Sequence, residues 1–331
     1  MPDAISPLSF FRILDPARPT EIPVAWRPDG TLLRLGQFRE EAFALAARLA
    51  QHRDVPRWAL CFEDAANLAT AFFAALLAGR QIVLPGHTRE ALLREMHGAG
   101  HFEGVLTDMP ALRGAEGSFA VLQVAGEAVA VGEAAPSIGP IGRMGPIGQI
   151  GTESLVSPIR PIGPICPIGP IEGATVAAPA SAAPAATTPP ALAPTVSFFT
   201  SGSTGQPKCV TKTIAQLQIE HDLHAAHWGQ RLPGTHIVGT TAHHHLYGLQ
   251  FRVLLPLSLG VPFNATLIEF HEQLLAVPRP FALITSPAFL KRLDDHIPLP
   301  ANSCRHIHSA GGFLPPDTAT RATALLGIAP F

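Results

Sequence analysis

The residues with the clearest potential for chemistry form one segment, which reads TSGSTGQPK from Thr200 to Lys208. Glycines and hydroxyl-bearing residues allow successive backbone N–H groups to turn toward one centre, and such turns bind phosphate. Pro207 restricts the backbone at the exit, and Lys208 adds a compact positive charge. The segment predicts a polyphosphate-binding site, and its candidate ligand-binding residues are Thr200, Ser201, Gly202, Ser203, Thr204, Gly205 and Lys208.

The spacing of this segment excludes the P-loop of NTPases, which requires GxxxxGK followed by Ser or Thr. The alternative is a flexible linker that continues the Ala/Pro-rich sequence before it. A linker gives no reason for Pro207 and Lys208 at these positions, so we favour phosphate binding.

Two strands and a helix are expected to hold the segment in place. Residues 195–199 predict a strand that enters it, and residues 209–212 predict a strand that leaves it. Thr213 and Gln216 have the spacing of a capping box, which predicts a helix that ends at Gly229. The segment should therefore connect two strands.

Alternating elements predict the fold class. The sequence predicts a strand at 58–62, a helix at 67–77 and a strand at 81–84. This order is typical of parallel sheets with helical crossovers. We predict an α/β fold with mostly parallel sheets. Two further short strands are predicted within 21–35, and single strands at 105–107, 119–124, 237–241, 281–285 and 306–309. The other predicted helices lie at 37–52, 88–97, 249–259 and 316–326, and one more begins at Pro287.

A low-complexity tract interrupts this pattern between residues 136 and 194. Glycine or Pro-Ile recurs every third residue in its first half, and its second half is almost wholly Ala, Pro and Thr. A collagen triple helix is excluded because the run is short and its period breaks. The tract predicts a disordered or polyproline-like insertion. We therefore expect a first α/β subdomain at 1–135, the insertion at 136–194, and a second, incomplete subdomain at 195–331.

The composition narrows the functional class. With 47% hydrophobic residues, 15% charged residues and a net charge of −2, the chain can bury a core but has no excess of positive charge for nucleic acid or anionic membranes. Its longest apolar run is about half the roughly 20 residues that a membrane-spanning helix needs. Four scattered cysteines and the absence of a signal-peptide pattern at the N-terminus indicate a cytoplasmic protein.

Histidines cluster in a second candidate segment, AHHHLYGL at 242–249. Three adjacent residues of one loop seldom converge on a metal, and no cysteine or carboxylate is near in sequence, so we predict no metal site. The spaced pairs His221/His224 and His306/His308 could each supply two ligands, but such pairs more often form a solvated or packed face.

A third candidate segment, SAGGFLP, covers residues 309–315. Gly311 and Gly312 lack a Cβ and would allow a ligand to approach the backbone closely. The alternative is a plain turn between a strand and a helix.

Together the three segments resemble the adenylate-forming family, which includes acyl- and aryl-CoA synthetases, luciferases and adenylation domains of peptide synthetases. The family's phosphate loop reads TSGSTGxPKG, and only Cys209 departs from it. The histidine segment is similar to the family's HxxGL, with His245 at the histidine position, and the third is similar to SGGAPL, with Phe313 where a small residue is usual. The resemblance covers about 58–326 and implies the family's N-terminal domain.

The resemblance implies an AMP-forming carboxylate ligase. A carboxylic acid would attack ATP to give an acyl adenylate, and the thiol of CoA or of an acyl carrier protein would then take the acyl group. Ser201, Ser203, Thr204 and Lys208 would hold the pyrophosphate, His245 would border the carboxylate as the catalytic residue, and Gly311 and Gly312 would lie near adenine and the acyl group. Residues 243–263 look similar to the AMP ligases of aryl-polyene pigment pathways.

The sequence also departs from the family. The YGxTE motif, whose glutamate helps to bind Mg²⁺, does not occur, and neither does the mobile C-terminal domain with its adenylation lysine. The resemblance thus implies a C-terminally truncated ligase with low or no turnover, and Phe313 would narrow a nearby pocket. Two alternatives remain: a module that binds nucleotide without turnover, and an interaction protein that acts through residues 136–194.

Overall fold

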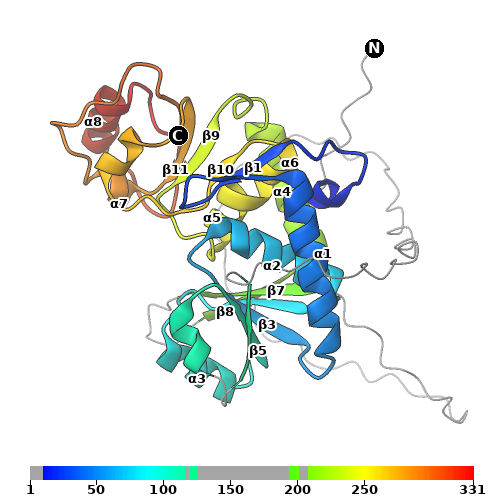
Figure 1. Cartoon of the computed structure of the whole chain (residues 1–331). Coiled ribbons are helices and arrows are strands. Elements are labelled where there is room, and N and C mark those ends of the chain that lie inside the picture. Colours follow the sequence, from blue (N-terminus) through cyan, green and yellow to red (C-terminus); the bar gives the residue numbers. More distant parts are fainter. Residues whose placement is uncertain (1–9, 116–118, 125–193, 201–207) are drawn as a thin grey trace, which may run out of the picture. The chain divides into compact units, whose positions relative to one another are not determined.

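A computed structural model describes residues 10–115, 119–124, 194–200 and 208–331 (Figure 1). Within them lie two six-stranded, mostly parallel sheets, which confirms the predicted fold class. The predicted insertion, apart from Pro194, and the central residues 201–207 of the phosphate-binding segment lie outside the described residues.

The first sheet has the order β6-β5-β3-β4-β7-β8, and every neighbouring pair is parallel except β7 and β8. Parallel neighbours need crossover connections, and α2 (Ala65–Leu77) supplies one. Asp64 caps α2 by accepting from the backbone N–H groups of Ala66 and Asn67 at 2.7 and 3.0 Å, and Gly79 follows its end with a φ of +67°. The strands are β3 (Arg57–Cys61), β4 (Gln81–Leu84), β5 (Gly104–Thr107), β6 (Ala120–Gln123), β7 (Thr195–Thr200) and β8 (Lys208–Thr213).

The second sheet has the order β12-β11-β9-β10-β1-β2 and is parallel except between β1 and β2. The turn between β1 and β2 contains Gly30 with a φ of +81°, as the sequence Pro-Asp-Gly predicts. The strands are β1 (Pro23–Trp26), β2 (Leu32–Arg34), β9 (His236–Gly239), β10 (Phe263–Asn264), β11 (Phe281–Thr285) and β12 (Cys304–Ser309).

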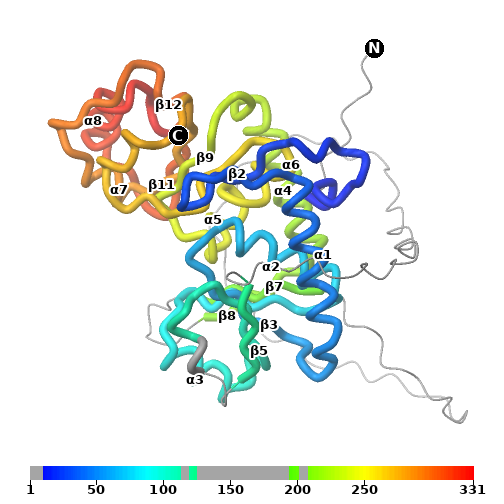
Figure 2. The backbone as a smooth tube through the Cα atoms, in the orientation of Figure 1, coloured from blue at the N-terminus to red at the C-terminus, as the bar shows by residue number. Residues whose placement is uncertain are grey.

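Each sheet draws strands from both sides of the low-complexity tract. β1 and β2, near the N-terminus, complete the sheet that contains β9 to β12, whereas β7 and β8 join β4 in the other sheet. Figure 2 shows β7, in green, within the sheet of the cyan strands. Strand pairing therefore crosses the predicted boundary between the subdomains 1–135 and 195–331. The division into these two subdomains stays a prediction from sequence order.

The remaining helices cover these sheets, and most match their predicted ranges. Phe38 of α1 packs its ring against Phe73 of α2, with ring centroids 5.8 Å apart in the shared apolar core. Helical elements besides α2 are η1 (Phe10–Leu14), α1 (Leu35–Gln51), α3 (Glu90–Gly98), η2 (Pro110–Ala115), α4 (Ile214–Trp228), α5 (Leu246–Gly248), η3 (Leu249–Leu254), α6 (Leu255–Leu259), η4 (His271–Leu275), α7 (Pro287–Leu290) and α8 (Pro316–Leu326).

The predicted helix at 249–259 is helical throughout, but its first part, η3, is a π-helix that joins α5 to α6. Pro256 has no N–H, so the carbonyl of Arg252 cannot receive its normal α-helical hydrogen bond there. The wider turn places Arg252 in the interior, where 1% of the residue is exposed. π-helical turns of this kind often occur at functional sites.

The capping box that begins α4 is present and gives a testable prediction. Thr213 Oγ1 accepts from the N–H of Gln216 at 3.2 Å, and Gln216 Oε1 accepts from the N–H of Thr213 at 2.9 Å. Replacement of Thr213 by alanine should lower the free energy of unfolding by about 1 kcal/mol, measured by urea denaturation. Thr213→Ser retains the acceptor and should stay close to wild type; equal losses in both variants would contradict the assignment.

Among the described residues, no helix is both long and apolar enough to cross a membrane. The described cysteines, Cys61, Cys209 and Cys304, are free thiols.

Candidate functional site

The two ends of the phosphate-binding segment lie opposite each other. Thr200 ends β7, Lys208 begins β8, and the two are register partners of the antiparallel pair. Thr200 Oγ1 donates to the carbonyl of Lys208 at 3.4 Å, and both residues are exposed. The roles of Ser201, Gly202, Ser203, Thr204 and Gly205 stay predictions, because these residues lie outside the described part of the chain.

Gly86 connects this hairpin to the histidine segment. It follows β4 with a φ of +74°, and a Cβ on it would overlap the carbonyl oxygen of Phe199 in β7 and lie 3.8 Å from Cε1 of His245. Gly86 is not among the site residues that the sequence predicts, and its one sequence signal is the dipeptide Pro85-Gly86 after a predicted strand. The contact places His245 close to the residue that precedes Thr200.

The three adjacent histidines have different environments. His243 is buried, and its Nε2 donates to the carbonyl of Phe62 at 2.9 Å. His244 is partly buried, whereas His245 is exposed, with its ring centroid 4.6 Å from that of His244. His245 is thus the most exposed ring of the three, and its role beside a ligand stays a prediction.

These histidines are neutral near pH 7. Burial, together with the smaller effect of the Arg252 charge, lowers the pKa of His243 to about 3. Burial and the neighbouring His245 lower the pKa of His244 to about 4, and desolvation also lowers the pKa of His245. A neutral imidazole such as that of the exposed His245 can donate one hydrogen bond without adding a fixed charge.

Tyr247 joins the histidine segment to the carboxyl ends of β11 and β12. Its hydroxyl lies 3.2 Å from the carbonyl of Thr285, 2.7 Å from the carbonyl of His308 and 2.8 Å from Nδ1 of His308. Burial raises the pKa of this phenol. The ring of His308 stacks on Phe251 with centroids 4.1 Å apart, so α5 and η3 are fixed against the strand ends.

The third predicted segment continues from these strand ends. The N–H of Ala310 donates to the carbonyl of Thr285 at 3.2 Å, and the chain then turns through Gly311 with a φ of +90°. Gly311 and Gly312 are exposed, and only Pro287 Cγ would lie within 4 Å of a Cβ on Gly312. Phe313 is 82% exposed, and the expectation that it narrows a nearby pocket stays a prediction.

The spaced histidine pairs belong to packed faces. His221 is buried, and His224 lies 4.5 Å from the ring of Phe251. His306 and His308 lie 5.0 and 4.8 Å from the ring of Trp228. Within the described part of the chain, no group of three or more histidine, cysteine, aspartate or glutamate residues could hold a metal ion.

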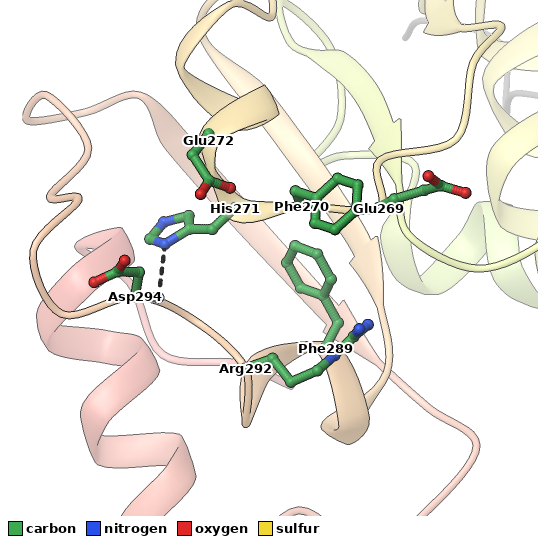
Figure 3. Close-up of a pocket in the computed structure, with 7 residues that line it drawn as sticks. All are labelled: Glu269, Phe270, His271, Glu272, Phe289, Arg292 and Asp294. Atoms are coloured by element: carbon green, nitrogen blue, oxygen red, sulfur yellow. Dashed lines mark hydrogen bonds between the residues drawn. The ribbon is translucent and has the colours of Figure 1, made fainter.

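A surface pocket of about 270 Å³ lies elsewhere, beside η4 and α7 (Figure 3). His271 lines it, with Nδ1 accepting from the N–H of Asp294 at 3.0 Å. None of the predicted site residues lines this pocket. Its other lining residues are Glu269, Phe270, Glu272, Phe289, Arg292 and Asp294.

Comparison with known proteins gives a family and a fold. A family model described as AMP-binding enzyme matches residues 147–331. No curated protein matches the sequence.

Solved structures match nearly the whole chain. ATP-bound MatB from Rhodopseudomonas palustris is 18% identical with a TM-score of 0.67, and 98% of this chain covers 58% of that one. A benzoate CoA ligase from Burkholderia xenovorans LB400 is 18% identical with a TM-score of 0.64, and the match covers 97% of this chain and 60% of that ligase. A malonyl-CoA ligase in a ternary product complex with methylmalonyl-CoA and AMP is 21% identical with a TM-score of 0.63, at 97% and 59% coverage. This chain thus spans well under two thirds of their length.

Proposed function

Because this chain belongs to the AMP-binding enzyme family, we propose that it binds ATP at the β7–β8 hairpin and activates a carboxylic acid as an acyl adenylate. One observation supports this most strongly. His245 lies beside Gly86 and Phe199 at the end of β7, and the same α5 segment is bonded through Tyr247 to the strand ends that lead to Gly311. Gly86 and Tyr247 therefore connect the histidine segment to Phe199 and His308, the residues that immediately precede the other two candidate segments.

The proposed reaction has two steps. An oxygen of the carboxylate attacks the α-phosphorus of ATP, the bond from that phosphorus to the bridging oxygen breaks, and pyrophosphate leaves. A thiol of CoA or of an acyl carrier protein then attacks the acyl carbon, and AMP leaves with the bonding electrons. Positioning and charge stabilisation dominate such chemistry. Lys208 would balance negative charge on the pyrophosphate, and neutral His245 would border the carboxylate without repelling its approach.

The substrate acid and the acceptor are open within this proposal. The relatives' structures concern malonyl, methylmalonyl and benzoate chemistry, so either an aliphatic or an aromatic acid is a candidate here. The likeness of residues 243–263 to aryl-polyene AMP ligases favours an aromatic acid and stays a prediction. Mg²⁺ is implied by the resemblance. Among the described residues no group of three or more histidine, cysteine, aspartate or glutamate side chains could hold a metal ion, and no role given above uses a residue as a Mg²⁺ ligand.

The test is ATP binding by calorimetry, together with release of pyrophosphate in the presence of a panel of aliphatic and aromatic acids. Binding with acid-dependent release of pyrophosphate is the expected result. Binding without release with any acid would favour the nucleotide-binding module, and no binding of ATP would contradict the proposal. Deletion of residues 136–193 should leave ATP affinity unchanged. If the deletion abolishes binding of a partner protein while ATP binding is retained, the alternative of an interaction protein would be favoured.

Lys208→Met gives a sharper prediction for the same site. We expect ATP affinity to fall about tenfold, which corresponds to about 1.4 kcal/mol, because a charge-assisted contact to phosphate is lost. Lys212→Met is the matched control, since Lys212 lies on the same strand but pairs with Glu220. Equal ATP affinities for the Lys208 variant and wild type would show that Lys208 does not bind the phosphates of ATP.

A further inference from the structure

Arg252 is a charged side chain in an unusual environment. Only 1% of it is exposed, and it is among the largest fully buried side chains of the described residues. In that part of the chain no carboxylate forms an ion pair with it. Burial lowers its pKa to about 10, which leaves it charged at neutral pH. A buried charge without an ion-pair partner is costly unless its hydrogen bonds are satisfied.

The partners of Arg252 are backbone carbonyls just beyond two strand ends. Nη1 donates to Thr241 at 2.7 Å, beyond β9, and Nη2 donates to Thr266 at 3.1 Å and to Asn264 at 3.5 Å, at the end of β10 and just beyond it. A planar guanidinium can hold several carbonyls in one fixed geometry, whereas an ammonium is a point donor. Thr241 lies two residues before His243.

Two glycines make room for this arrangement. A Cβ on Gly239, the last residue of β9, would overlap Nε and Cδ of Arg252. A Cβ on Gly248 would overlap the carbonyl oxygen of Ala242. The histidine turn is therefore held by Arg252 at its start, by the bond from His243 to Phe62 in its middle and by close packing at its end.

We propose that Arg252 is the positioning residue of the histidine turn at 241–245, which it orients through its fork of carbonyl bonds so that the ring of His245 lies beside Gly86 and Phe199. Arg252 does not touch the ligand in this proposal. Its link to ATP affinity depends on the function proposed above, whereas its link to the orientation of His245 does not.

Arg39 offers a matched control in the same chain. It is 7% exposed, and its guanidinium also donates to three carbonyls, those of Ile13, Arg18 and Asp15. These carbonyls belong to the N-terminal segment and not to the histidine turn. Arg39→Lys should therefore have the structural cost of losing a buried guanidinium fork without an effect on His245.

The experiment compares Arg252→Lys with Arg39→Lys in the full chain. We measure ring NMR signals of His244 and His245, with His245→Gln for assignment, ATP affinity by calorimetry, and unfolding in urea. Both lysine variants should lose stability to a similar extent. Only Arg252→Lys should shift or broaden the signals of both rings and weaken ATP binding about tenfold, because the turn that it orients lies beside Phe199, the residue before Thr200.

Each outcome decides the proposal. Unchanged ring signals in folded Arg252→Lys would overturn the proposal, because a positive charge without the guanidinium fork would then be enough to orient the histidine turn. Equal ring shifts in Arg39→Lys would also overturn it, since the effect would follow general stability. If Arg252→Lys does not fold, Gly239→Ala takes its place, because the added Cβ would displace the same guanidinium. This variant should then shift the ring signals of His244 and His245, and unchanged signals would overturn the proposal. If wild type fails to bind ATP, the proposed function fails, and the ring signals still decide the role of Arg252.

Discussion

Gly86→Ala should lower the free energy of unfolding by about 3 to 5 kcal/mol, because a positive φ disfavours any side chain and the new Cβ would overlap a backbone carbonyl that cannot rotate away. That carbonyl belongs to Phe199, one residue before Thr200. The strand that leads into the phosphate-binding segment must shift, so ATP affinity should fall together with stability. Urea denaturation and calorimetry measure the two effects.

Gly79→Ala is the matched control for this prediction. Gly79 precedes β4 as Gly86 follows it, has a similar φ of +67°, and has no atom within 4 Å of an added Cβ. We expect a loss of about 1 to 2 kcal/mol from backbone strain alone, with unchanged ATP affinity. If both alanine variants lose the same stability, the overlap with Phe199 is not the cause.

Acid should destabilise the protein, and His243 is one of the groups responsible. Its pKa is about 3 in the folded chain, against an ordinary value near 6.5, so between these values the unfolded chain binds a proton that the folded chain does not. The stabilisation is complete above about pH 6.5 and is lost progressively as the pH falls toward 3. Between pH 6.5 and 5, His243 alone should cost about 2 kcal/mol at 1.36 kcal/mol for each pH unit.

His243→Gln tests this prediction by urea denaturation at pH 7.5, 6 and 5. The glutamine amide can still donate to the carbonyl of Phe62 but does not titrate, so the variant should lose less stability on acidification than wild type. The exposed His296→Gln variant should keep the wild-type pH dependence. Parallel stability curves for His243→Gln and wild type would show that His243 does not take up a proton on unfolding. His244 and His308, each with a pKa lowered to about 4 by burial, account for a remaining slope.

Local features of the fold follow from the sequence. The capping box at Thr213 begins α4, Pro287 opens α7, and the predicted range 316–326 is the range of α8. Such signals act over a few residues, through side-chain caps and restricted backbone angles, so one stretch contains all the information they need. The chemistry of the phosphate-binding segment is similarly local, because its donors and its charge are adjacent in the chain.

Tertiary structure alone decided which segments meet. Residues 23–26 of β1 pair with β10 across more than two hundred residues, and no pattern within 23–26 specifies that partner. Gly86 and Arg252 are ordinary residues in the sequence and acquire their roles only when β7 lies on β4 and when the π-helical turn directs Arg252 toward the ends of β9 and β10. The physical reason is that side-chain chemistry belongs to single residues, whereas burial, the pKa of His243 and contact with a distant carbonyl depend on neighbours that only the folded chain supplies.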